Sequence, residues 1–352
     1  MRWSVLGQGV DKRAAQPFTF RRAARRPGDR QLPTFDFEPE VLRTYRSTVT
    51  PPADFDAFWS RTLAETRVFP IAAQFAAADF GLKLFDVFDL TYAGFGGHPV
   101  RGWFIVPKGA TGKLPLVIRY IGYGGGRSLP LDHLVWPAAG YAHLVMDTRG
   151  QGSAWSPGDT ADPVGSDPAH PGFMTRGLLH PDTYYYRRVF TDAVRAVEAG
   201  LSHPAVDGTR IAVVGGSQGG GISLAAAGLE PRIGAVMADV PFLCDFPRAV
   251  RIAPRDPYGE VSRYLSIHRD QVATAFETLR YFDGVCFAGR IKAATLVSVA
   301  QMDTICPPST IYAAYNALAA ADRTITDYGF NDHEGGGVFQ HHEQLRWLAK
   351  RF

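Results

Sequence analysis

A serine in a glycine-rich turn is the residue of this chain best suited to do chemistry. The hydrophobic stretch that starts at Ile211 runs into Gly215-Gly216-Ser217-Gln218-Gly219, a G-x-S-x-G spacing. A nucleophilic serine needs a sharp strand-to-helix turn that exposes its hydroxyl, and small neighbours let this strained backbone close. We therefore predict that Ser217 is a nucleophile, although such turns also occur as plain packing or as phosphate-binding loops.

An acid and a histidine follow Ser217 in the order that a hydrolase triad requires. Asp303 ends the apolar run AATLVSVAQMD, and His333 lies in a glycine-rich loop after the stretch ITDYGF. Seen alone, Asp303 would more often cap the helix expected after Cys306, and His333 would more often pack in a loop. Because the chain order is Ser, then Asp, then His, and both residues follow expected strands, we predict that they complete a triad.

Rival residues near the expected base are less suitable. His341 and His342 lie inside the expected C-terminal helix, and the other seven histidines precede Asp303. Asp332 and Glu334 flank His333, but sequence neighbours rarely point at the same imidazole. We expect indirect support at most from these two carboxylates.

Two backbone N–H groups are candidates for an oxyanion hole, where one donor is worth about 3–4 kcal/mol in a comparable enzyme. Gln218 follows the nucleophile, and Tyr123 lies in a glycine-rich loop after a strand expected to end at Gly122. A phosphate-binding loop is disfavoured, because no Gly-Lys-Ser/Thr follows and no acidic residue lies suitably downstream. We predict that these two groups bind the oxyanion.

From about Phe35 to its end, the chain resembles carbohydrate esterase family seven. This family is the acetyl xylan esterase and cephalosporin C deacetylase group. The resemblance is carried by Tyr120–Tyr123 (YIGY), Asp147–Ser153 (DTRGQGS), Gly215–Gly220, His333-Glu334, Thr183–Arg188 and Cys306–Thr310. It implies an intracellular enzyme that deacetylates short xylo-oligosaccharides and often also cephalosporin C. It also implies a homo-oligomer, a hexamer built as a trimer of dimers.

The resemblance places the triad on Ser217, Asp303 and His333 and the oxyanion donors on Tyr123 and Gln218. It places Arg149 and Gln151 near the base of the site as structural supports. Acyl-enzyme chemistry by a Ser-His-Asp triad requires no metal and no organic cofactor. The sequence departs from the family pattern at Gly124 and Thr304, which puts the fine substrate preference in doubt.

Acetyl selectivity would need a short, walled acyl pocket, because each further buried methylene otherwise adds about 0.8 kcal/mol of favourable transfer. Matching positions in the family suggest Tyr123, Trp136, Pro241 and Ile305 as the walls. For Trp136 and Pro241, core packing explains the residue type equally well.

The elements that must position these residues alternate along the chain. With 352 residues, 46% hydrophobic and 20% charged, the chain is long enough for one large α/β core over residues 34–352. Expected strands are Lys83–Tyr92, Pro99–Val106, Leu114–Gly122, Ala142–Met146, Arg210–Val214, Ile233–Ala238, Thr295–Val299 and Thr324–Tyr328. Helical patterns between them, such as Tyr185–Leu201, predict an α/β-hydrolase fold with a mostly parallel sheet covered on both faces.

Two parts depart from simple alternation. The first two expected strands read as an antiparallel hairpin at the sheet edge. The segment 241–291 is too long for one crossover connection, and we predict that it forms a helical insertion. This insertion either caps the site or adds packing and oligomer contacts.

The beginning of the chain differs in charge from the rest. Residues 1–30 hold eight Lys or Arg and two acidic residues, a balance of +6, so the remaining residues carry −3 of the formal +3. The Arg-rich start lacks a convincing amphipathic pattern, so we expect residues 1–33 to be a disordered extension rather than a transit peptide or nucleic-acid arm.

Further features bear on the compartment. No apolar run suggests Sec export or a membrane span. Three cysteines without metal-like spacing, Cys244, Cys286 and Cys306, fit a reduced, cytoplasmic protein.

The sequence therefore predicts a serine esterase that acts on a small acetylated carbohydrate or antibiotic, with no nucleic-acid or membrane partner. A general short-chain carboxylesterase or a serine peptidase on the same fold is the alternative. A hydrolase fold that only binds ligands is a third possibility, and a complete triad with two oxyanion segments argues against it.

Overall fold

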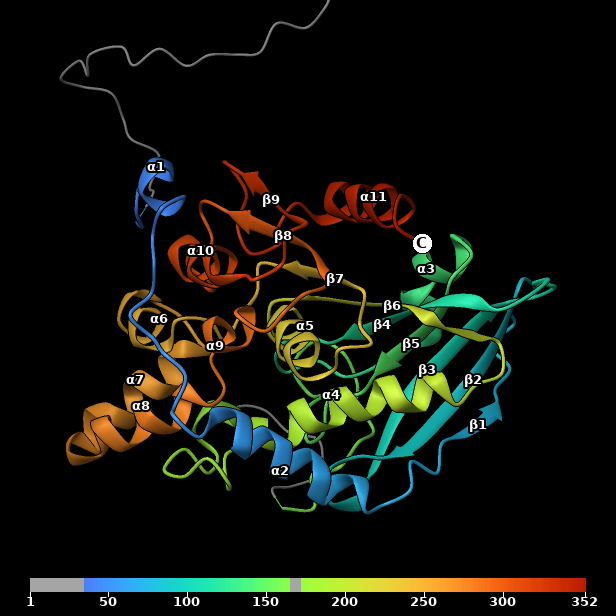
Figure 1. Ribbon diagram of the computed structural model, residues 1–352, viewed down its shortest axis with the longest axis horizontal. Coiled ribbons are helices and arrows are strands. Elements are labelled where there is room, and N and C mark those ends of the chain that lie inside the picture. Colours follow the sequence, from blue (N-terminus) through green and yellow to red (C-terminus); the bar gives the residue numbers. More distant parts are fainter. Residues whose placement is uncertain (1–34, 165–171) are drawn as a thin grey trace, which may run out of the picture. The chain divides into compact units, whose positions relative to one another are not determined.

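The computed structural model describes residues 35–164 and 172–352, so the extension expected at residues 1–33 lies outside the described residues. The described chain forms one nine-stranded sheet in the order β1-β2-β3-β5-β4-β6-β7-β8-β9 (Figure 1). The strands are β1 (Gln74–Ala77), β2 (Phe85–Ala93), β3 (Pro99–Pro107), β4 (Leu114–Tyr120), β5 (Ala142–Met146), β6 (Val206–Gly216), β7 (Ala235–Asp239), β8 (Ala294–Ala300) and β9 (Arg323–Tyr328).

The neighbouring strands β5, β4, β6, β7, β8 and β9 run parallel to one another. The pairs β1–β2, β2–β3 and β3–β5 are antiparallel. The predicted α/β fold with a mostly parallel sheet is therefore confirmed. The predicted hairpin is present as β2 and β3, but its place at the sheet edge was wrong, because β1 pairs outside β2. The sequence QFAA of β1 is short and alanine-rich, and alanine is depleted in strands, which explains why the strand was missed.

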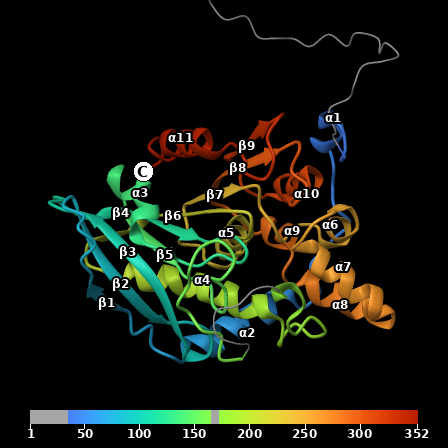
Figure 2. The same cartoon turned by 180° about the vertical axis from the view of Figure 1, so that it is seen from behind.

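Helices cover both faces of the sheet (Figures 1 and 2). The α-helices are α1 (Pro39–Leu42), α2 (Phe55–Arg67), α3 (Val135–Ala138), α4 (Tyr185–Leu201), α5 (Gln218–Leu229), α6 (Phe246–Ile252), α7 (Tyr258–Ile267), α8 (Val272–Arg280), α9 (Gly284–Ala288), α10 (Pro308–Ala317) and α11 (Gly337–Leu348). Short 3₁₀ turns are η1 (Phe95–Gly97), η2 (Pro130–His133), η3 (Phe173–Thr175) and η4 (Arg269–Gln271). No helix within the described ranges is both long and apolar enough to cross a bilayer.

Alternate side chains of β4 enter two different hydrophobic clusters. Leu116 and Ile118 belong to the large core that includes residues of α4, α5 and α10. Val117 belongs to a smaller cluster with Trp136 of α3 and Leu348 of α11. Because side chains alternate between the two faces of a strand, the next odd-numbered residue, Arg119, shares the face of α3 and α11.

The segment predicted as a helical insertion, residues 241–291, holds α6, α7, η4, α8 and α9. Glu260 of α7 accepts hydrogen bonds from the Tyr123 hydroxyl and from the backbone N–H groups of Gly172 and Met174. The insertion is thus tied to the loop that follows β4. Its role as a cap stays a prediction.

Candidate active site

The turn between β6 and α5 holds Ser217 in a strained conformation, with φ 55° and ψ −120°. The backbone N–H of Ser217 donates to the carbonyl of Asp239 at 2.9 Å. A Cβ on Gly215 would lie 2.4 Å from the backbone of Gly219, and one on Gly219 would lie 2.2 Å from the Tyr120 carbonyl oxygen. Both glycines are therefore required by close backbone approach, and the turn has the geometry of a nucleophile elbow.

The end of β8 positions the acid. Asp303 is fully buried, and its Oδ1 accepts the backbone N–H groups of Ile305 and Cys306 at 2.8 and 2.9 Å. Its Oδ2 lies 2.8 Å from Nδ1 of His333. Because an ionised carboxylate only accepts hydrogen bonds, this contact puts the proton of a neutral imidazole on Nδ1 and leaves Nε2 as an acceptor.

The rival carboxylates bind elsewhere. Asp332 accepts the backbone N–H of His333 at 2.9 Å, and Glu334 accepts from the Asn331 side chain and the backbone N–H of Asp332. The structure thus brings Asp303, not its rivals, to the imidazole. His342 on α11 is exposed, whereas its neighbour His341 lines the same cavity as Ser217.

The two segments expected to supply oxyanion donors are joined by a reciprocal amide pair. Gln151 donates from Nε2 to Oε1 of Gln218 at 2.8 Å, and Gln218 donates from Nε2 to Oε1 of Gln151 at 3.1 Å. Gln151 Oε1 also accepts the backbone N–H of Gly124 at 2.7 Å. Gln218 is the first residue of α5, whose opening N–H groups have no partner within the helix. The amide pair therefore fixes the loop that carries Tyr123 relative to the elbow.

Arg149 lies beneath this network as a buried ion pair. Its Nε and Nη2 donate to the two carboxylate oxygens of Asp192 at 2.5 and 2.7 Å, and Nη1 lies 3.5 Å from Asp162. The Tyr185 hydroxyl donates to its carbonyl oxygen. Arg149 thus ties the loop after β5 to α4, and within the described residues its guanidinium makes no hydrogen bond or ion pair with Ser217 or His333.

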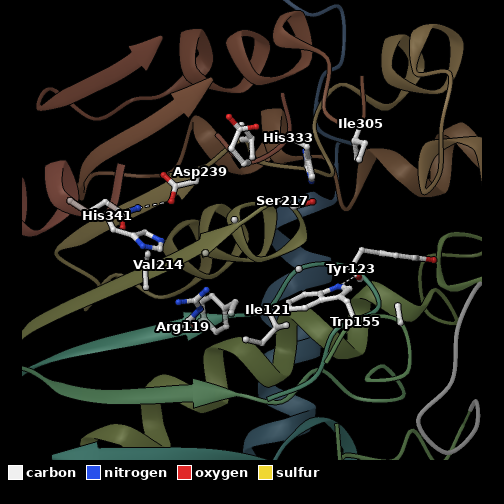
Figure 3. A pocket seen from close by; sticks show the side chains of 18 of the residues that line it. Arg119, Ile121, Tyr123, Trp155, Val214, Ser217, Asp239, Ile305, His333 and His341 are labelled. Carbon is white, nitrogen blue, oxygen red and sulfur yellow. Dashed lines mark hydrogen bonds between the residues drawn. The ribbon is translucent and has the colours of Figure 1, made fainter. Parts of the chain in front are cut away.

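Ser217 and His333 line a cavity of about 700 Å³ that also receives Trp136 and Ile305. Pro241, predicted as a wall of the acyl pocket, is not among the lining residues and packs against Gly220 of α5. Trp136 is 3% exposed and stacks edge-on with Tyr141, so most of its surface is core. Of the predicted walls, Ile305 and Tyr123 contact the cavity beside Ser217 (Figure 3).

Trp155 is a lining residue that the sequence did not reveal. It is 62% exposed, and its indole N–H donates to the carbonyl oxygen of Tyr123 at 2.8 Å. The signal was an aromatic residue just after the DTRGQGS motif, but only the fold shows that this loop returns to Tyr123. The Tyr123 hydroxyl is held by Glu260 at 2.7 Å, and burial raises its pKa, so it stays protonated.

Among the described residues, one cluster has the donor types of a metal site. The ligand atoms of Asp303, Cys306 and His333 all lie within 4.8 Å of one another. Burial raises the pKa of the Cys306 thiol well above its ordinary value, which disfavours the thiolate that a metal would need. The donor set fits a triad acid and base better than a metal centre.

Comparison with known proteins gives a consistent result. A family model described as acetyl xylan esterase matches residues 32–351. Acetyl esterase Axe7A of Xylanibacter ruminicola is 29% identical over 318 residues, which cover 90% of this chain and 70% of that protein.

Solved structures agree. An acetyl xylan esterase from a Paenibacillus species is 38% identical with a TM-score of 0.83, and acetyl xylan esterase 1 from a Thermoanaerobacterium species is 33% identical with a TM-score of 0.81. Each match covers 90% of this chain and 100% of the other. An acylaminoacyl peptidase of Pyrococcus horikoshii, 16% identical with a TM-score of 0.54 over 76% of this chain and 40% of its own, shows the shared fold alone. This chain therefore belongs to the acetyl xylan esterase (AXE1) family and is a carboxylic ester hydrolase of the acetyl esterase type.

Proposed function

We propose that this esterase removes acetyl groups from short acetylated xylo-oligosaccharides and from cephalosporin C, with Ser217 as nucleophile, His333 as base and Asp303 as the orienting acid. One observation carries the proposal. The strained elbow presents Ser217 to the same cavity as an imidazole whose Nδ1 is held at 2.8 Å by a fully buried carboxylate.

The acylation step follows from this geometry. His333 Nε2 takes the proton of the Ser217 hydroxyl while its oxygen attacks the acetyl carbonyl carbon. The backbone N–H groups of Gln218 and Tyr123 stabilise the negative charge that develops on the carbonyl oxygen. The tetrahedral intermediate then collapses, and the imidazolium returns the proton to the departing sugar oxygen.

The deacylation step reverses the roles. Water replaces the alcohol, His333 takes its proton, and the resulting hydroxide attacks the acetyl-enzyme. The ester bond to Ser217 breaks, the serine oxygen recovers the proton, and acetate leaves. Asp303 stabilises the imidazolium in both steps without accepting its proton.

The acyl group has a limited space in this arrangement. Ile305, Tyr123 and Trp155 approach the cavity near Ser217 (Figure 3). The Tyr123 hydroxyl is fixed by Glu260 and by the backbone N–H of Phe173. A wall tethered in this way resists longer acyl chains, which supports a preference for acetate.

The test is kcat/KM for nitrophenyl esters from acetate to octanoate, followed by acetylated xylo-oligosaccharides and cephalosporin C. We expect a steep fall beyond propionate, and Ser217→Ala should lower kcat by about 10⁵–10⁶-fold, as in other serine hydrolases. A flat or rising chain-length profile would favour a general carboxylesterase. Activity that survives in Ser217→Ala would exclude this nucleophile.

A further inference from the structure

Arg119 is a charged side chain that lines the catalytic cavity without a hydrogen bond or ion pair to the described residues. The three acidic residues that line the cavity are all engaged. Asp239 accepts from Gln340 and Gln344, Asp256 pairs with Arg263, and Glu334 binds Asn331. Within the described part of the chain, Arg119 is thus the fixed charge of this cavity that has no partner.

The sheet places Arg119 near Ser217. Arg119 pairs in register with Val214, three residues before the nucleophile, which corresponds to about 10 Å along a strand. Between them, Gly216 leaves open space, because a Cβ there would meet nothing closer than the Asp239 carbonyl oxygen at 4.0 Å. The cavity is therefore continuous from Ser217 to Arg119.

Figure 3 shows the two ends of this cavity. Ile305 and Tyr123 lie on one side of Ser217, and Arg119, Asp239 and His341 lie on the other. Tyr123 belongs to the oxyanion loop, so its side is where the carbonyl group and the short acyl chain belong. The side of Arg119 is left for the alcohol part of the ester.

An arginine without a partner in a substrate cavity is suited to bind an anionic group of the substrate. Partial burial in the cavity wall lowers the pKa of Arg119, although arginine stays charged at neutral pH. Arg119 is partly buried, and a charge that is withdrawn from water gains more from a hydrogen-bonded partner of opposite charge than an exposed one does. The planar guanidinium matches the two oxygens of a carboxylate with two parallel hydrogen bonds.

Asp239 does not cancel this preference. It lies more than salt-bridge distance from Arg119, and its two oxygens accept from the amides of Gln340 and Gln344 at 2.9 and 2.6 Å. Burial raises its pKa to about 6. His341 lies on the same side, and burial and Arg119 lower its pKa, so a neutral imidazole N–H is available as a further donor.

We propose that Arg119 binds a carboxylate on the alcohol part of the substrate, so that the enzyme favours acetyl esters of anionic alcohols. This inference rests on the proposed function of Ser217. A uronic acid on an oligosaccharide and the ring carboxylate of a β-lactam are two sources of the same group.

The test compares two esters with the same acetyl group, 3-acetoxybenzoate and its neutral methyl ester. The ratio of their kcat/KM values isolates the effect of the charge. In Arg119→Gln the ratio of anionic to neutral ester should fall at least about tenfold, mainly through KM of the anionic ester, as expected for loss of a charged hydrogen-bonded pair. Arg119→Lys should retain part of the ratio, because it keeps the charge without the fork.

Arg346→Gln is the matched control, because Arg346 lies on the exposed side of α11, and its ratio should equal that of the wild type. Thermal unfolding of each variant checks that it is folded. An unchanged ratio in folded Arg119→Gln, or an equal loss for both esters, would overturn the carboxylate site. Absence of Ser217-dependent hydrolysis of either ester by the wild type would instead overturn the proposed function.

Cephalosporin C and a uronic-acid-bearing acetylated xylo-oligosaccharide then separate the two sources. The substrate whose kcat/KM falls in Arg119→Gln is the one whose carboxylate Arg119 binds.

Discussion

At the scale of single residues, the amide pair between Gln151 and Gln218 has a role that touches no substrate atom. Its hydrogen bonds hold Gly124, next to Tyr123, and the first residue of α5 at a fixed separation. Both proposed oxyanion donors are therefore positioned by one buried side chain, that of Gln151.

We predict that Gln151→Met lowers kcat by up to about a hundredfold with little change in KM, because small misplacement of donors affects the transition state more than substrate binding. Steady-state kinetics on nitrophenyl acetate measures the split. Reaction of Ser217 with a phosphonate probe checks that the nucleophile is still accessible. A variant that changes only KM would contradict a positioning role.

Arg149 is a second single residue with a structural role, and we expect its replacement to change the stability of the fold. Arg149→Met leaves the buried Asp192 carboxylate with the backbone N–H of Phe95 as its remaining donor in the described part of the chain. We expect the free energy of unfolding in urea to fall by about 3–5 kcal/mol. The double variant Arg149→Met with Asp192→Leu should recover much of the loss, since no uncompensated charge remains. Equal stability of the two variants would contradict this explanation.

At the scale of elements, one carboxyl group joins two helices of the 241–291 segment. Asp283 is fully buried and accepts the backbone N–H groups of Asp245, Phe246 and Val285 at 2.9 Å each. It caps α9 and holds the start of α6. Burial outweighs these hydrogen bonds and raises its pKa from 3.8 to about 7.

A raised carboxyl pKa makes the folded state hold a proton that the unfolded chain has lost. Between these two pKa values the folded state binds more protons, so its stability falls as pH rises, by about 2 kcal/mol between about pH 5 and about pH 7.5. Asp283→Asn removes this contribution. We therefore expect its stability relative to wild type to improve by that amount over this pH range in urea unfolding.

Asp270→Asn, at an exposed position of η4, serves as the control and should show no such trend. A difference between Asp283→Asn and wild type that does not vary with pH would contradict the raised pKa.

At the scale of the whole molecule, the expected hexamer stays a prediction. The loop that carries His333 is flanked by large exposed side chains, with Phe330 78%, Val338 73% and Phe339 75% exposed. Large apolar side chains are the residues that an assembly interface would cover. We expect Phe339→Asp to lower the molar mass measured by sedimentation at micromolar concentration, and a wild type that sediments as a monomer would contradict the assembly.

Local physics made part of this molecule predictable. Strands such as Ala142–Met146 are short apolar runs, and a run of that kind predicts a strand that is buried on both faces. Ser217 could be singled out as a candidate nucleophile because its sharp turn can close only with glycine at positions 215 and 219. This backbone constraint is therefore visible in the neighbouring residues of the sequence. Chain order then selected Asp303 and His333 from among their rivals.

Only the tertiary structure decided which distant residues share the cavity. Arg119, Asp239 and His341 come from β4, β7 and α11, and none of their local patterns refers to the others. Their meeting depends on strand order, on which face of β4 an odd-numbered residue takes, and on how α11 packs across the sheet. The same holds for Trp155 and for Pro241. The sequence by itself determined the α/β alternation, and it predicted Ser217 as nucleophile with Asp303 and His333 as its partners, because these predictions follow from local geometry and chain order. The lining of the cavity around Arg119 required the fold, because contact between distant segments is set by packing.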